Sequence, residues 1–571
     1  MHRLGSFLSD WWRLAVPFFK SEERVIAIAL LIGAIGIVLG QVGLEVLFND
    51  WSRRFYDALE KKDEAAFWRE ITTFSWLAAL FIAAAVTRYI VSPYLRLRWR
   101  RWLTRRYLAH WFDDRGYYRI ELQRKVDNAD QRIAEDLRQL GEFTMLLLLG
   151  FISAVATLVS FIFILWKLSG PLSLAPIGID IVIPGYMAIA ALLYAIVGTV
   201  LAHFVGRRLI TLNFMKQRYE ATFRFGLVRV RENAEGIALY NGEEREAEEL
   251  NMRFADVFRN GWRVLFTEAQ LTLYQAGYAQ MAIIFPYLVT APRFFAGAIT
   301  LGVMMQTASA FGQVYQSLSF FVTNYTYVAE LRAVMDRLIG LQQAAADKPA
   351  TQIEVAATGT ADVAVEHLTL ALPNGQALLQ DTTLALPKGS STLVVGQSGS
   401  GKSTLFRALA GIWPFGQGRV RVPEGARVLF LPQKPYIPIG TLREAVKYPD
   451  EESKATDAEI VEALTAAQLG HLAGRLDEDA HWSNVLSGGE QQRLAIARAL
   501  VFKPDWLFMD EGTASLDEAT EAVVYGELKK RLAGTTIVSI GHRPSLQQWH
   551  DRRLELRREP GQVGRLVEAP V

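Results

Sequence analysis

A glycine-rich segment in the second half of the chain carries residue types that hold phosphate groups. It reads Gly396-Gln397-Ser398-Gly399-Ser400-Gly401-Lys402-Ser403 and is followed by Thr404. Glycines let backbone N–H groups close around phosphates, and the start of a following helix adds a favourable dipole. The ammonium of Lys402 supplies positive charge to the β- and γ-phosphates, and the Ser403 hydroxyl is a ligand for Mg²⁺. The segment therefore predicts a site for ATP and Mg²⁺.

The elements that this motif requires surround it. Residues 391–395 predict a strand leading into the glycine loop, and Thr404–Ala410 predicts the helix that follows. Alternating apolar residues from Val363 onward predict an earlier strand, which ends in a turn at Pro373-Asn374-Gly375. Strand, loop and helix thus occur in the order that a phosphate-binding loop needs.

Further positions fit hydrolysis of the bound nucleotide. The apolar run 506–509 predicts a strand that ends in Asp510 and Glu511. We expect Asp510 to hold Mg²⁺ through water and Glu511 to polarise the attacking water as a general base. Gln433 is placed to sense Mg²⁺, and His542 to hydrogen-bond the γ-phosphate. The expected catalytic set is Glu511, His542, Gln433 and Lys402, and the expected metal set is Ser403, Gln433 and Asp510. An exposed acidic strand end is the alternative interpretation of Asp510-Glu511.

Composition excludes several other classes of site. The 571 residues carry a net charge of only +2, so no basic field favours nucleic acid as a partner. The chain has no cysteine, which rules out disulfides and thiolate metal sites. Its eight histidines show no paired ligand spacing, so a structural zinc site is not expected.

The first half of the chain is rich in long apolar stretches. Six of them are long enough to cross about 30 Å of hydrocarbon at about 1.5 Å per residue. The alternative, buried helices of a soluble protein, rarely gives helices that are apolar on every side. The second and fifth stretches are the least uniform because they contain Arg88 and Glu268. The predicted spans are 25–48, 71–95, 143–168, 181–206, 267–290 and 298–328.

The basic residues between these stretches predict their orientation. The connections after the third and fifth spans are short and hold only Lys167 and Arg293, whereas those after the second and fourth spans are long and rich in arginine. The connection around 51–68 is an exception in which acidic residues balance the basic ones. Positive residues favour the cytoplasmic side, so we expect the N-terminus, both long loops and the nucleotide domain to be cytoplasmic. The basic residues in question are Arg96, Arg98, Arg100, Arg101, Arg105 and Arg106, and then Arg207, Arg208, Lys216, Arg218 and Arg224.

The two long loops are helical in composition, so we expect the membrane helices to continue into the cytoplasm and return. Brief breaks in helical periodicity mark their tips at Asp127–Ile133 and Glu235–Gly242. These tips are the natural places for a nucleotide-driven motor to push on the membrane domain. An ordinary helix–turn–helix is the alternative.

Two stripes of polar side chains occupy predicted spans. One, in the sixth span, repeats at helical spacing, and a shorter one opens the fifth span. Polar groups are costly in lipid, so both stripes should face a wet cavity or another helix that they bond. Glu45 in the first span could contact substrate, carry a proton, or reach the membrane interface. The stripes are Gln306, Ser309, Gln313, Gln316, Ser317 and Asn324, and then Glu268, Thr272 and Gln275.

These features predict three regions. Residues 1–340 form a polytopic α-helical membrane domain with six spans. Residues 341–361 are polar and contain no long apolar run, which predicts a linker. Residues 362–571 form an α/β P-loop nucleotide-binding domain.

The motif set resembles ATP-binding-cassette (ABC) transporters, specifically the exporter-shaped half-transporters with six spans. In that family the segment Leu486-Ser487-Gly488-Gly489-Glu490 is the signature that closes over ATP bound to the opposite subunit. Ala514-Ser515-Leu516-Asp517 looks like the loop that crosses the dimer interface. The resemblance implies a domain-swapped homodimer with two composite ATP sites, in which Ser487, Gly488, Gly489 and Glu490 contact the nucleotide. Two positions depart from the family pattern: Leu372 replaces an adenine-stacking aromatic residue, and Gly512 replaces a proline.

The membrane half narrows the resemblance. The segments Asn49–Leu59 and Asn128–Ile133 look like those of the BacA-type transporters of bacteria. Those transporters are linked to uptake of cobalamin, bleomycin and antimicrobial peptides. The second segment, with Tyr240-Asn241-Gly242, is also similar to the peroxisomal fatty-acyl (ABCD-like) transporters.

The resemblance leaves three functions open. The leading hypothesis is a homodimer in the bacterial inner membrane that uses ATP to import bulky hydrophilic compounds or peptides. The second is transport of fatty acyl-CoA or a related amphiphilic lipid. The third is a membrane ATPase that senses a ligand without transporting it.

Overall fold

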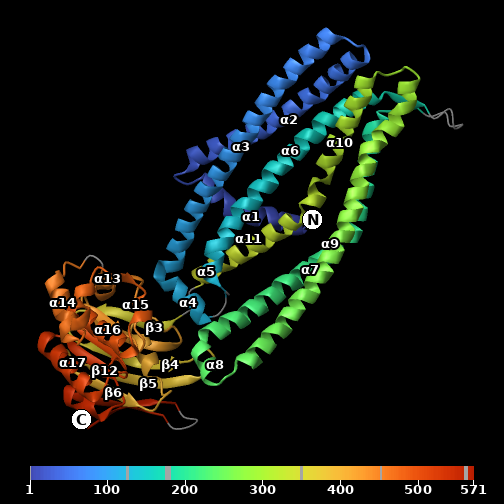
Figure 1. The fold of residues 1–571 in the computed structure, drawn as a ribbon. Coiled ribbons are helices and arrows are strands. Elements are labelled where there is room, and N and C mark those ends of the chain that lie inside the picture. The colour runs from blue at the N-terminus through green and yellow to red at the C-terminus, as the bar shows by residue number, and fades with distance from the viewer. Residues whose placement is uncertain are drawn as a thin grey trace. The chain divides into compact units, whose positions relative to one another are not determined.

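The computed structural model describes residues 2–123, 126, 128–173, 182–347, 351–450, 453–558 and 563–570. The chain divides into two compact units, Met1–Asp347 and Lys348–Val571. The first unit is almost entirely helical, and the second combines strands with helices (Figure 1).

Long helices make up the first unit. Several begin at side-chain caps: the Asp63 carboxylate accepts from the Ala66 N–H at 2.9 Å, and the Thr300 hydroxyl accepts from the Val303 N–H at 3.3 Å. The helices are α1 (His2–Phe19), α2 (Arg24–Glu60), α3 (Glu64–Phe112), α4 (Gly116–Gln123), α5 (Ala129–Gln131), α6 (Leu137–Ser169), α7 (Tyr186–Glu232), α8 (Ala234–Leu239), α9 (Glu243–Phe295), α10 (Leu301–Thr323) and α11 (Tyr325–Ala346), with a short strand pair β1 (Pro171–Ser173) and β2 (Val182–Pro184) before α7.

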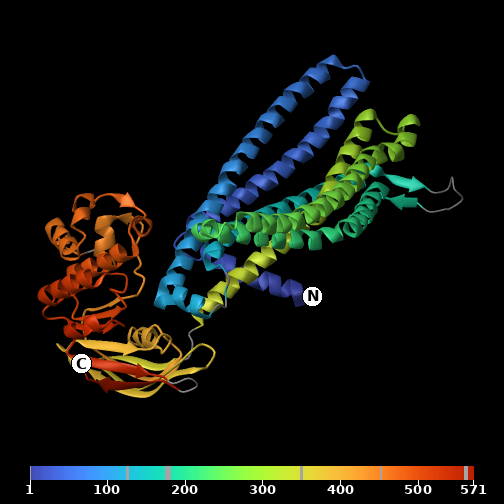
Figure 2. The same ribbon diagram turned by 60° about the horizontal axis from the view of Figure 1, so that its bottom comes forward.

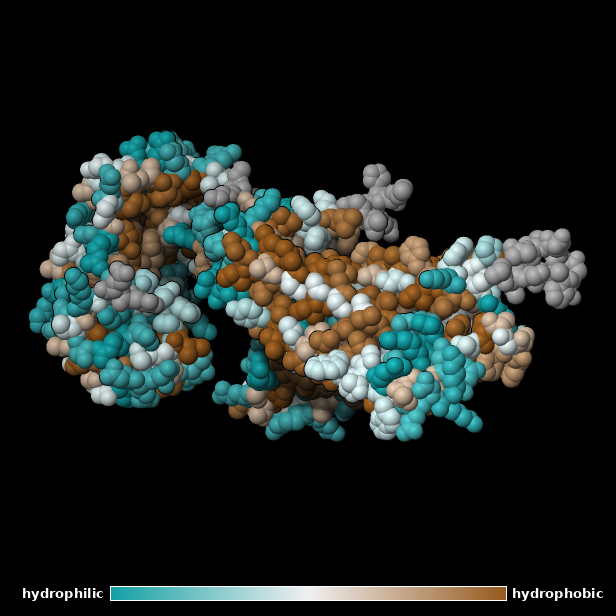
Figure 3. All heavy atoms as spheres, turned by 90° about the horizontal axis from the view of Figure 1, so that it is seen from above, coloured by the Kyte–Doolittle hydropathy of each residue, from teal (hydrophilic) through white to brown (hydrophobic). Residues whose placement is uncertain are grey.

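Among the described residues, four helical stretches are long and apolar enough to cross a membrane: Arg24–Glu60, Glu64–Gln123, Ala129–Ser169 and Tyr186–Glu232. Apolar side chains cover much of the surface of this unit in Figure 3, as expected of helices that face lipid. The predicted fifth and sixth spans fall in α9 and α10, which do not reach the same apolar content. Six spans therefore stays a prediction.

Two predicted span boundaries were wrong. The fourth span was placed at 181–206, but residue 181 lies outside the described residues and 182–184 form β2. Gly185 adopts a φ of 62° at the start of α7, so the helix begins only at Tyr186. The sixth span was placed at 298–328, but Thr300 caps α10 and Asn324 ends it. The Asn324 side-chain amide donates to the Phe320 carbonyl at 2.8 Å, and α11 starts anew at Tyr325.

Helices α7 and α9 form a long antiparallel pair that lies side by side in Figures 1 and 2. Their 47 and 53 residues correspond to roughly 70 and 80 Å, more than twice the hydrocarbon thickness of a bilayer. Side chains join the pair along its length: Tyr194 Oη donates to the Tyr278 carbonyl at 2.6 Å and Asn260 Nδ2 to the Leu212 carbonyl at 3.0 Å. Both helices are therefore long enough for the predicted continuation beyond the membrane.

The two predicted loop tips have different structures. Asp127 lies outside the described residues, whereas Asn128 has a φ of 50° and α5 and a π-helical turn (Arg132–Asp136) follow it. The buried carboxylate of Asp136 accepts two hydrogen bonds from Arg337 of α11, at 2.7 and 2.8 Å. At the second tip a six-residue helix, α8, occupies most of the predicted break.

The polar stripe predicted on the sixth span does not face a single environment. Gln306 is buried against α2, where its backbone carbonyl accepts from Asn49 Nδ2 at 3.0 Å, so it belongs to a helix contact. Ser309 and Gln316 are exposed, and Gln313, Ser317 and Asn324 are half-buried. The stripe on the fifth span, Glu268, Thr272 and Gln275, is exposed throughout in the single chain.

The predicted linker is shorter than 341–361 because α11 continues to Ala346 and a strand, β3, covers Gln352–Thr358. Leu341 and Ala344 pack into the helical core, which explains why the helix persists through this polar sequence. Residues 348–350 lie outside the described residues.

The described part of the second unit has two main sheets and a short antiparallel strand pair, β9–β10. The larger has the strand order β14-β13-β6-β12-β11-β8, with every neighbouring pair parallel except β13–β14. The smaller has the order β3-β7-β4-β5. Apolar side chains of β6, β11 and β12 pack with α14, α16 and α17 in one core. The strands are β4 (Val363–Ala371), β5 (Ala377–Leu386), β6 (Thr392–Gly396), β7 (Gly416–Pro423), β8 (Val428–Leu431), β9 (Gly440–Thr441), β10 (Asp479–Ala480), β11 (Trp506–Asp510), β12 (Thr536–Ile540), β13 (Arg552–Arg557) and β14 (Arg565–Ala569), and the helices are α12 (Lys402–Leu409), α13 (Leu442–Lys447), α14 (Asp457–Ala466), α15 (Trp482–Val485), α16 (Gly488–Phe502) and α17 (Glu518–Arg531).

Candidate nucleotide site

The register of the larger sheet brings the predicted functional segments to one edge. Ile540 at the end of β12 pairs with both Val394 of β6 and Asp510 of β11, and Met509 pairs with Leu431 at the end of β8. The segments that follow these strands therefore leave the sheet side by side. They carry the glycine loop, Glu511, His542 and Gln433. Ligands in parallel α/β sheets bind at this carboxyl edge.

Glycine is required at two ends of the phosphate-binding loop. At Gly396 a Cβ atom would lie 2.6 Å from the carbonyl oxygen of Leu556, so no side chain fits between β6 and β13. Gly401 adopts a φ of 110° where the loop turns into α12, a conformation that L side chains avoid. Together they let the loop curl back over the start of the helix.

The loop presents donors suited to phosphate. Lys402 is 6% exposed, and its ammonium donates to the carbonyls of Gly396 and Gln397 at 2.9 Å each. Burial lowers the pKa of Lys402, while the charges of Glu511 and Asp510 oppose that shift. The buried Ser400 hydroxyl has no protein partner among the described residues, and Thr404 is also buried. Gln397, Ser398 and Gly399 are exposed. This set of groups fits a triphosphate, whose oxygens accept hydrogen bonds from the ammonium, hydroxyl and backbone N–H groups of the loop.

Two of the predicted Mg²⁺ ligands are in contact. Ser403 Oγ donates to Asp510 Oδ1 at 3.1 Å, which places a hydroxyl and a carboxylate together beside the loop. Hard oxygen ligands of this kind suit Mg²⁺, which keeps several waters and bridges to phosphate. Burial raises the pKa of Asp510, and the hydrogen bond from Ser403 opposes that shift.

The carboxylate of Glu511 lies between two of the other predicted catalytic side chains, Gln433 and His542. Gln433 Nε2 donates to Glu511 Oε2 at 2.8 Å, and His542 Nε2 lies 3.1 Å from Glu511 Oε1. The backbone of Glu511 has a φ of 51°, an unfavourable value for a residue with a side chain, and its N–H donates to the Ile540 carbonyl at 3.0 Å. Backbone strain of this kind is typical of functional sites. The structure thus brings Gln433, Glu511 and His542 together.

The signature segment lies at the start of α16. Ser487 caps this helix in a reciprocal capping box: its hydroxyl accepts from the Glu490 N–H, and Glu490 Oε2 accepts from the Ser487 N–H at 2.9 Å. Hydrogen bonds from the Ser487 backbone lower the pKa of Glu490. The Glu490 carboxylate therefore shapes the helix terminus, which leaves Ser487, Gly488 and Gly489 to face a ligand. Within the described part of the chain, no hydrogen bond or ion pair joins the signature segment to residues 396–404.

Sequence reasoning did not find three buried or half-buried polar residues beside this site, Gln492, Glu521 and Arg543. Gln492 donates to the carbonyls of Gln433 and Glu511 at 3.3 and 3.2 Å. Glu521 shares one face of α17 with the buried Val524, Tyr525 and Leu528. That helical spacing was a usable signal, because an acid in line with a core stripe is not a surface residue.

Comparison with known proteins agrees with this geometry. Residues 12–295 match the family model described as ABC transporter transmembrane region 2, and residues 379–514 match the model described as ABC transporter. The chain is 33% identical to the inner membrane ABC transporter ATP-binding protein YddA of Escherichia coli, over 95% of the chain and 96% of the relative. It is 33% identical to the chloroplastic ABC transporter D family member 2 of Arabidopsis thaliana, over 97% of the chain and 86% of that protein. A bacterial Atm1-family ABC exporter with ATP bound has a similar fold, with a TM-score of 0.75, 20% identity, and coverage of 93% of this chain and 94% of the exporter.

The phosphate loop, the acidic strand end and the relatives of nearly full length lead to one assignment. The chain belongs to the ABC transporters, as a half-size member of exporter-type fold that joins a membrane region to one ATP-binding domain and couples ATP hydrolysis to transport.

Proposed function

We propose that the protein acts as a homodimer in the bacterial inner membrane and uses ATP to import bulky hydrophilic compounds or peptides. The observation that supports the motor most directly is the Glu511 carboxylate between Gln433 and His542, beside the Lys402 loop. Glu511 is the proposed general base, His542 positions the water and the γ-phosphate, and Lys402 neutralises phosphate charge. Ser403 and Asp510, with Gln433, hold Mg²⁺.

The proposed substrate class follows from polar side chains that the helical bundle does not absorb. On α10, Ser309 and Gln316 are exposed and Gln313 is half-buried, at spacings of three and four residues. Glu268, Thr272 and Gln275 are exposed on α9. Such groups are costly against lipid and favourable against a hydrated cargo. Cargo of the cobalamin, bleomycin or antimicrobial-peptide type is therefore our first candidate, and fatty acyl-CoA or a related amphiphile is the second. We place the N-terminus and the nucleotide unit in the cytoplasm, on the arginine-rich extensions of α3 and α7.

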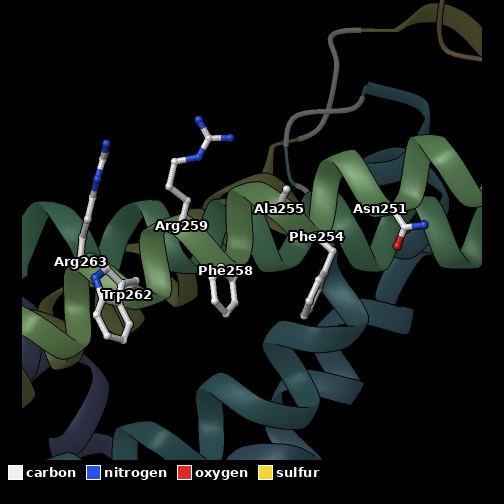
Figure 4. Close-up of a pocket in the computed structure, with 7 residues that line it drawn as sticks. All are labelled: Asn251, Phe254, Ala255, Phe258, Arg259, Trp262 and Arg263. Atoms are coloured by element: carbon white, nitrogen blue, oxygen red, sulfur yellow. The ribbon is translucent and has the colours of Figure 1, made fainter.

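An exposed aromatic stripe on α9 supports the homodimer. Phe254, Phe258 and Trp262 follow one another at one-turn spacing and point to one side of α9, whereas Arg259 and Arg263 of the same hollow point to the other side (Figure 4). They line a hollow of about 490 Å³, and Trp262 is 62% exposed in the single chain. A contiguous row of exposed large aromatic side chains marks a surface that contacts another apolar surface. A second copy of the chain is the proposed cover, because the signature segment also needs a second copy to meet a phosphate loop.

Reconstituted protein should import labelled cobalamin or a labelled antimicrobial peptide when ATP is supplied on the side of the nucleotide unit. Uptake into proteoliposomes measures this directly, and vesicles with the Lys402→Met variant provide the background. ATP-driven movement of labelled acyl-CoA with no uptake of either hydrophilic compound would replace our first candidate by the second. Ligand-stimulated hydrolysis with no transport at all would favour the sensing ATPase.

Replacing Glu511 by glutamine should leave ATP binding intact and reduce steady-state hydrolysis by about 100-fold or more, the loss expected when a general base is removed. The variant should also accumulate ATP-bound dimer, which size-exclusion chromatography and crosslinking can detect. Glu518→Gln, at an exposed acid on α17, is the matched control. Hydrolysis at the wild-type rate in Glu511→Gln would reject Glu511 as the base.

Asp510→Asn should raise the Tm of the nucleotide-free, Mg²⁺-free protein at pH 7.5 by roughly 2 °C and abolish Mg²⁺-dependent hydrolysis. The folded protein raises the pKa of Asp510, so ionisation of this carboxyl destabilises it above the pKa of the unfolded chain, about 3.9. The gain should shrink as the pH falls through the raised pKa, because the wild-type carboxyl then becomes neutral as well. Thermal scans from pH 4.5 to 7.5 test this, with the exposed Asp479→Asn as the control. A lower Tm for Asp510→Asn at pH 7.5 would contradict the prediction.

Trp262→Glu should weaken the dimer, because it places a charge within the aromatic stripe, at the end formed by Trp262. We expect the monomer fraction in detergent to rise at least tenfold, measured by mass photometry. Arg263→Glu introduces the same charge one residue along, on a side chain that points away from the stripe (Figure 4), and should leave the dimer unchanged. Equal effects of the two substitutions would contradict a dimer contact through this stripe.

A further inference from the structure

The segment that joins Glu511 to α17 is irregular in structure but closely held. Residues 512–517 lie between β11 and α17, and include the Ala514–Asp517 loop that the family resemblance places at the dimer interface. Successive groups of this segment hydrogen-bond to buried or half-buried side chains from other elements: Thr513 to Glu521, Ala514 and Leu516 to Arg543, and Ser515 to Gln492. A surface loop does not need so many attachments to stay folded.

Glu521 is the centre of the first attachment. Its side chain lies on the core face of α17 and is only 1% exposed. Oε2 accepts from Thr513 Oγ1 at 2.9 Å, Oε1 accepts from Ser545 Oγ at 2.7 Å, and the Arg543 guanidinium lies 3.6 Å from Oε2. A carboxylate is buried only at high cost, and both its oxygens are bonded here. Glu521 therefore joins Thr513, two residues after Glu511, to Ser545, three residues after His542.

Arg543 extends this attachment into the interface loop. Its Nη2 donates to the Ala514 carbonyl at 3.0 Å, and its Nη1 donates to the Leu516 carbonyl at 2.5 Å. The guanidinium is planar with fixed donor directions, so it fixes the two carbonyls relative to each other. Arg543 directly follows His542, whose ring lies 3.1 Å from Glu511. A shift of the loop therefore reaches His542 through the neighbouring residue.

Gln492 makes a second attachment on the other side of the same segment. Its Oε1 accepts from the Ser515 N–H at 2.9 Å, while its Nε2 donates to the carbonyls of Glu511 and Gln433. It is 3% exposed and shares no partner with Glu521. The two attachments hold the loop independently, so removing one leaves the fold of the segment supported by the other.

We propose that Glu521 is a positioning residue for ATP hydrolysis, holding the 513–516 loop and His542 in one fixed arrangement through Arg543, Thr513 and Ser545. This inference rests on the proposed roles of Glu511 and His542. Glu521 hydrogen-bonds none of the residues that hold the phosphates or Mg²⁺, so it affects the reaction only by placing other residues. Small displacements of reacting groups cost large factors in rate, whereas nucleotide affinity depends mainly on the phosphate loop. Loss of this placement should lower kcat and spare KM.

Glu521→Gln tests the proposal because it keeps the shape of the side chain and removes its attraction for Arg543. In the full-length protein in nanodiscs we expect kcat for ATP hydrolysis to fall about tenfold and KM for ATP to change less than twofold. Arg543→Lys keeps a positive charge but loses the paired carbonyl bonds, and should show the same split. Glu518→Gln, an exposed acid one turn earlier on α17, should match the wild type. A wild-type kcat in Glu521→Gln would overturn the proposal.

A double variant tests whether Glu521 and Arg543 position the 513–516 loop together or affect kcat separately. If Glu521 and Arg543 act as one unit, combining the two substitutions should lower kcat little beyond Arg543→Lys alone. Multiplication of the two single effects would overturn the proposal. Should Glu521→Gln unfold the domain in thermal scans, Thr513→Val becomes the deciding variant, because it removes one bond and leaves the carboxylate paired. We expect it to reduce kcat two- to fivefold at unchanged KM, and a wild-type kcat would overturn the proposal.

The same assays separate this inference from the proposed function. Wild-type hydrolysis in Glu511→Gln would reject Glu511 as the general base, a role on which both the proposed function and this inference depend. Loss of hydrolysis in Glu511→Gln together with a wild-type kcat in Glu521→Gln would leave the proposed function intact and reject the positioning role alone.

Discussion

The parallel pairing of β6, β12, β11 and β8 is the constraint on which the nucleotide site depends. Because Ile540 pairs with Val394 and Asp510, β11 and β12 end at the same level and β6 ends two residues beyond it, so the chain leaves the sheet there in closely spaced segments. Each segment then needs only one or two residues to reach the phosphate loop. The strained φ of Glu511 belongs to this arrangement, since its N–H still bonds the Ile540 carbonyl while its side chain turns toward Gln433 and His542.

The helical unit follows a different rule, because its polar groups must be satisfied by neighbouring helices. The start of α10 shows this: the N–H groups of Leu301 and Gly302 donate to Glu60 and Asp57 of α2, each at 3.0 Å. These acids cap a helix other than their own, which explains why α2 continues well past its predicted apolar span. Gln306 and Asn49 join the same two helices one or more turns along. Some polar residues in this unit thus join helices, whereas others, such as Glu268 and Gln275, stay exposed in the single chain.

The sequence allowed us to predict those parts of the site that depend on local spacing. The strand before the phosphate loop, the strand ending at Asp510 and the helix after the loop all lie within two residues of their predicted bounds, because each motif lies within one local unit of strand, loop and helix. The sequence predicted catalytic roles for Gln433, His542 and Glu511 but not that their side chains meet, because these contacts depend on the order of the strands in the sheet. Glu521 and Gln492 were missed because a single sequence does not show what a buried polar group bonds, although the helical spacing of Glu521 with Val524, Tyr525 and Leu528 indicated its burial. The early end predicted for α11 has a similar origin: Leu341 and Ala344 lie in a sequence that is otherwise polar, and only their packing partners show that the helix continues there. Gln306 likewise could face a cavity or a helix, and its contact with Asn49 decides for the helix.

Helix α16 offers a physical route between the two ends of the proposed dimer site. Its first residues, Gly488 and Gly489, are the signature, and Gln492 lies one turn further along the same helix. A helix of this length moves as a rigid element, so a ligand that draws Gly488 toward it displaces Gln492 in the same direction. Gln492 hydrogen-bonds Ser515, Glu511 and Gln433, so a displacement of Gln492 would move the backbone of Glu511, the proposed base, and the 513–516 loop together. Glu521 and Arg543 resist that displacement from the opposite side of the loop. In the proposed dimer, the segment that carries Glu511 is thus held between Gln492, which belongs to the same helix as the signature, and Glu521 with Arg543, which are anchored within the same unit.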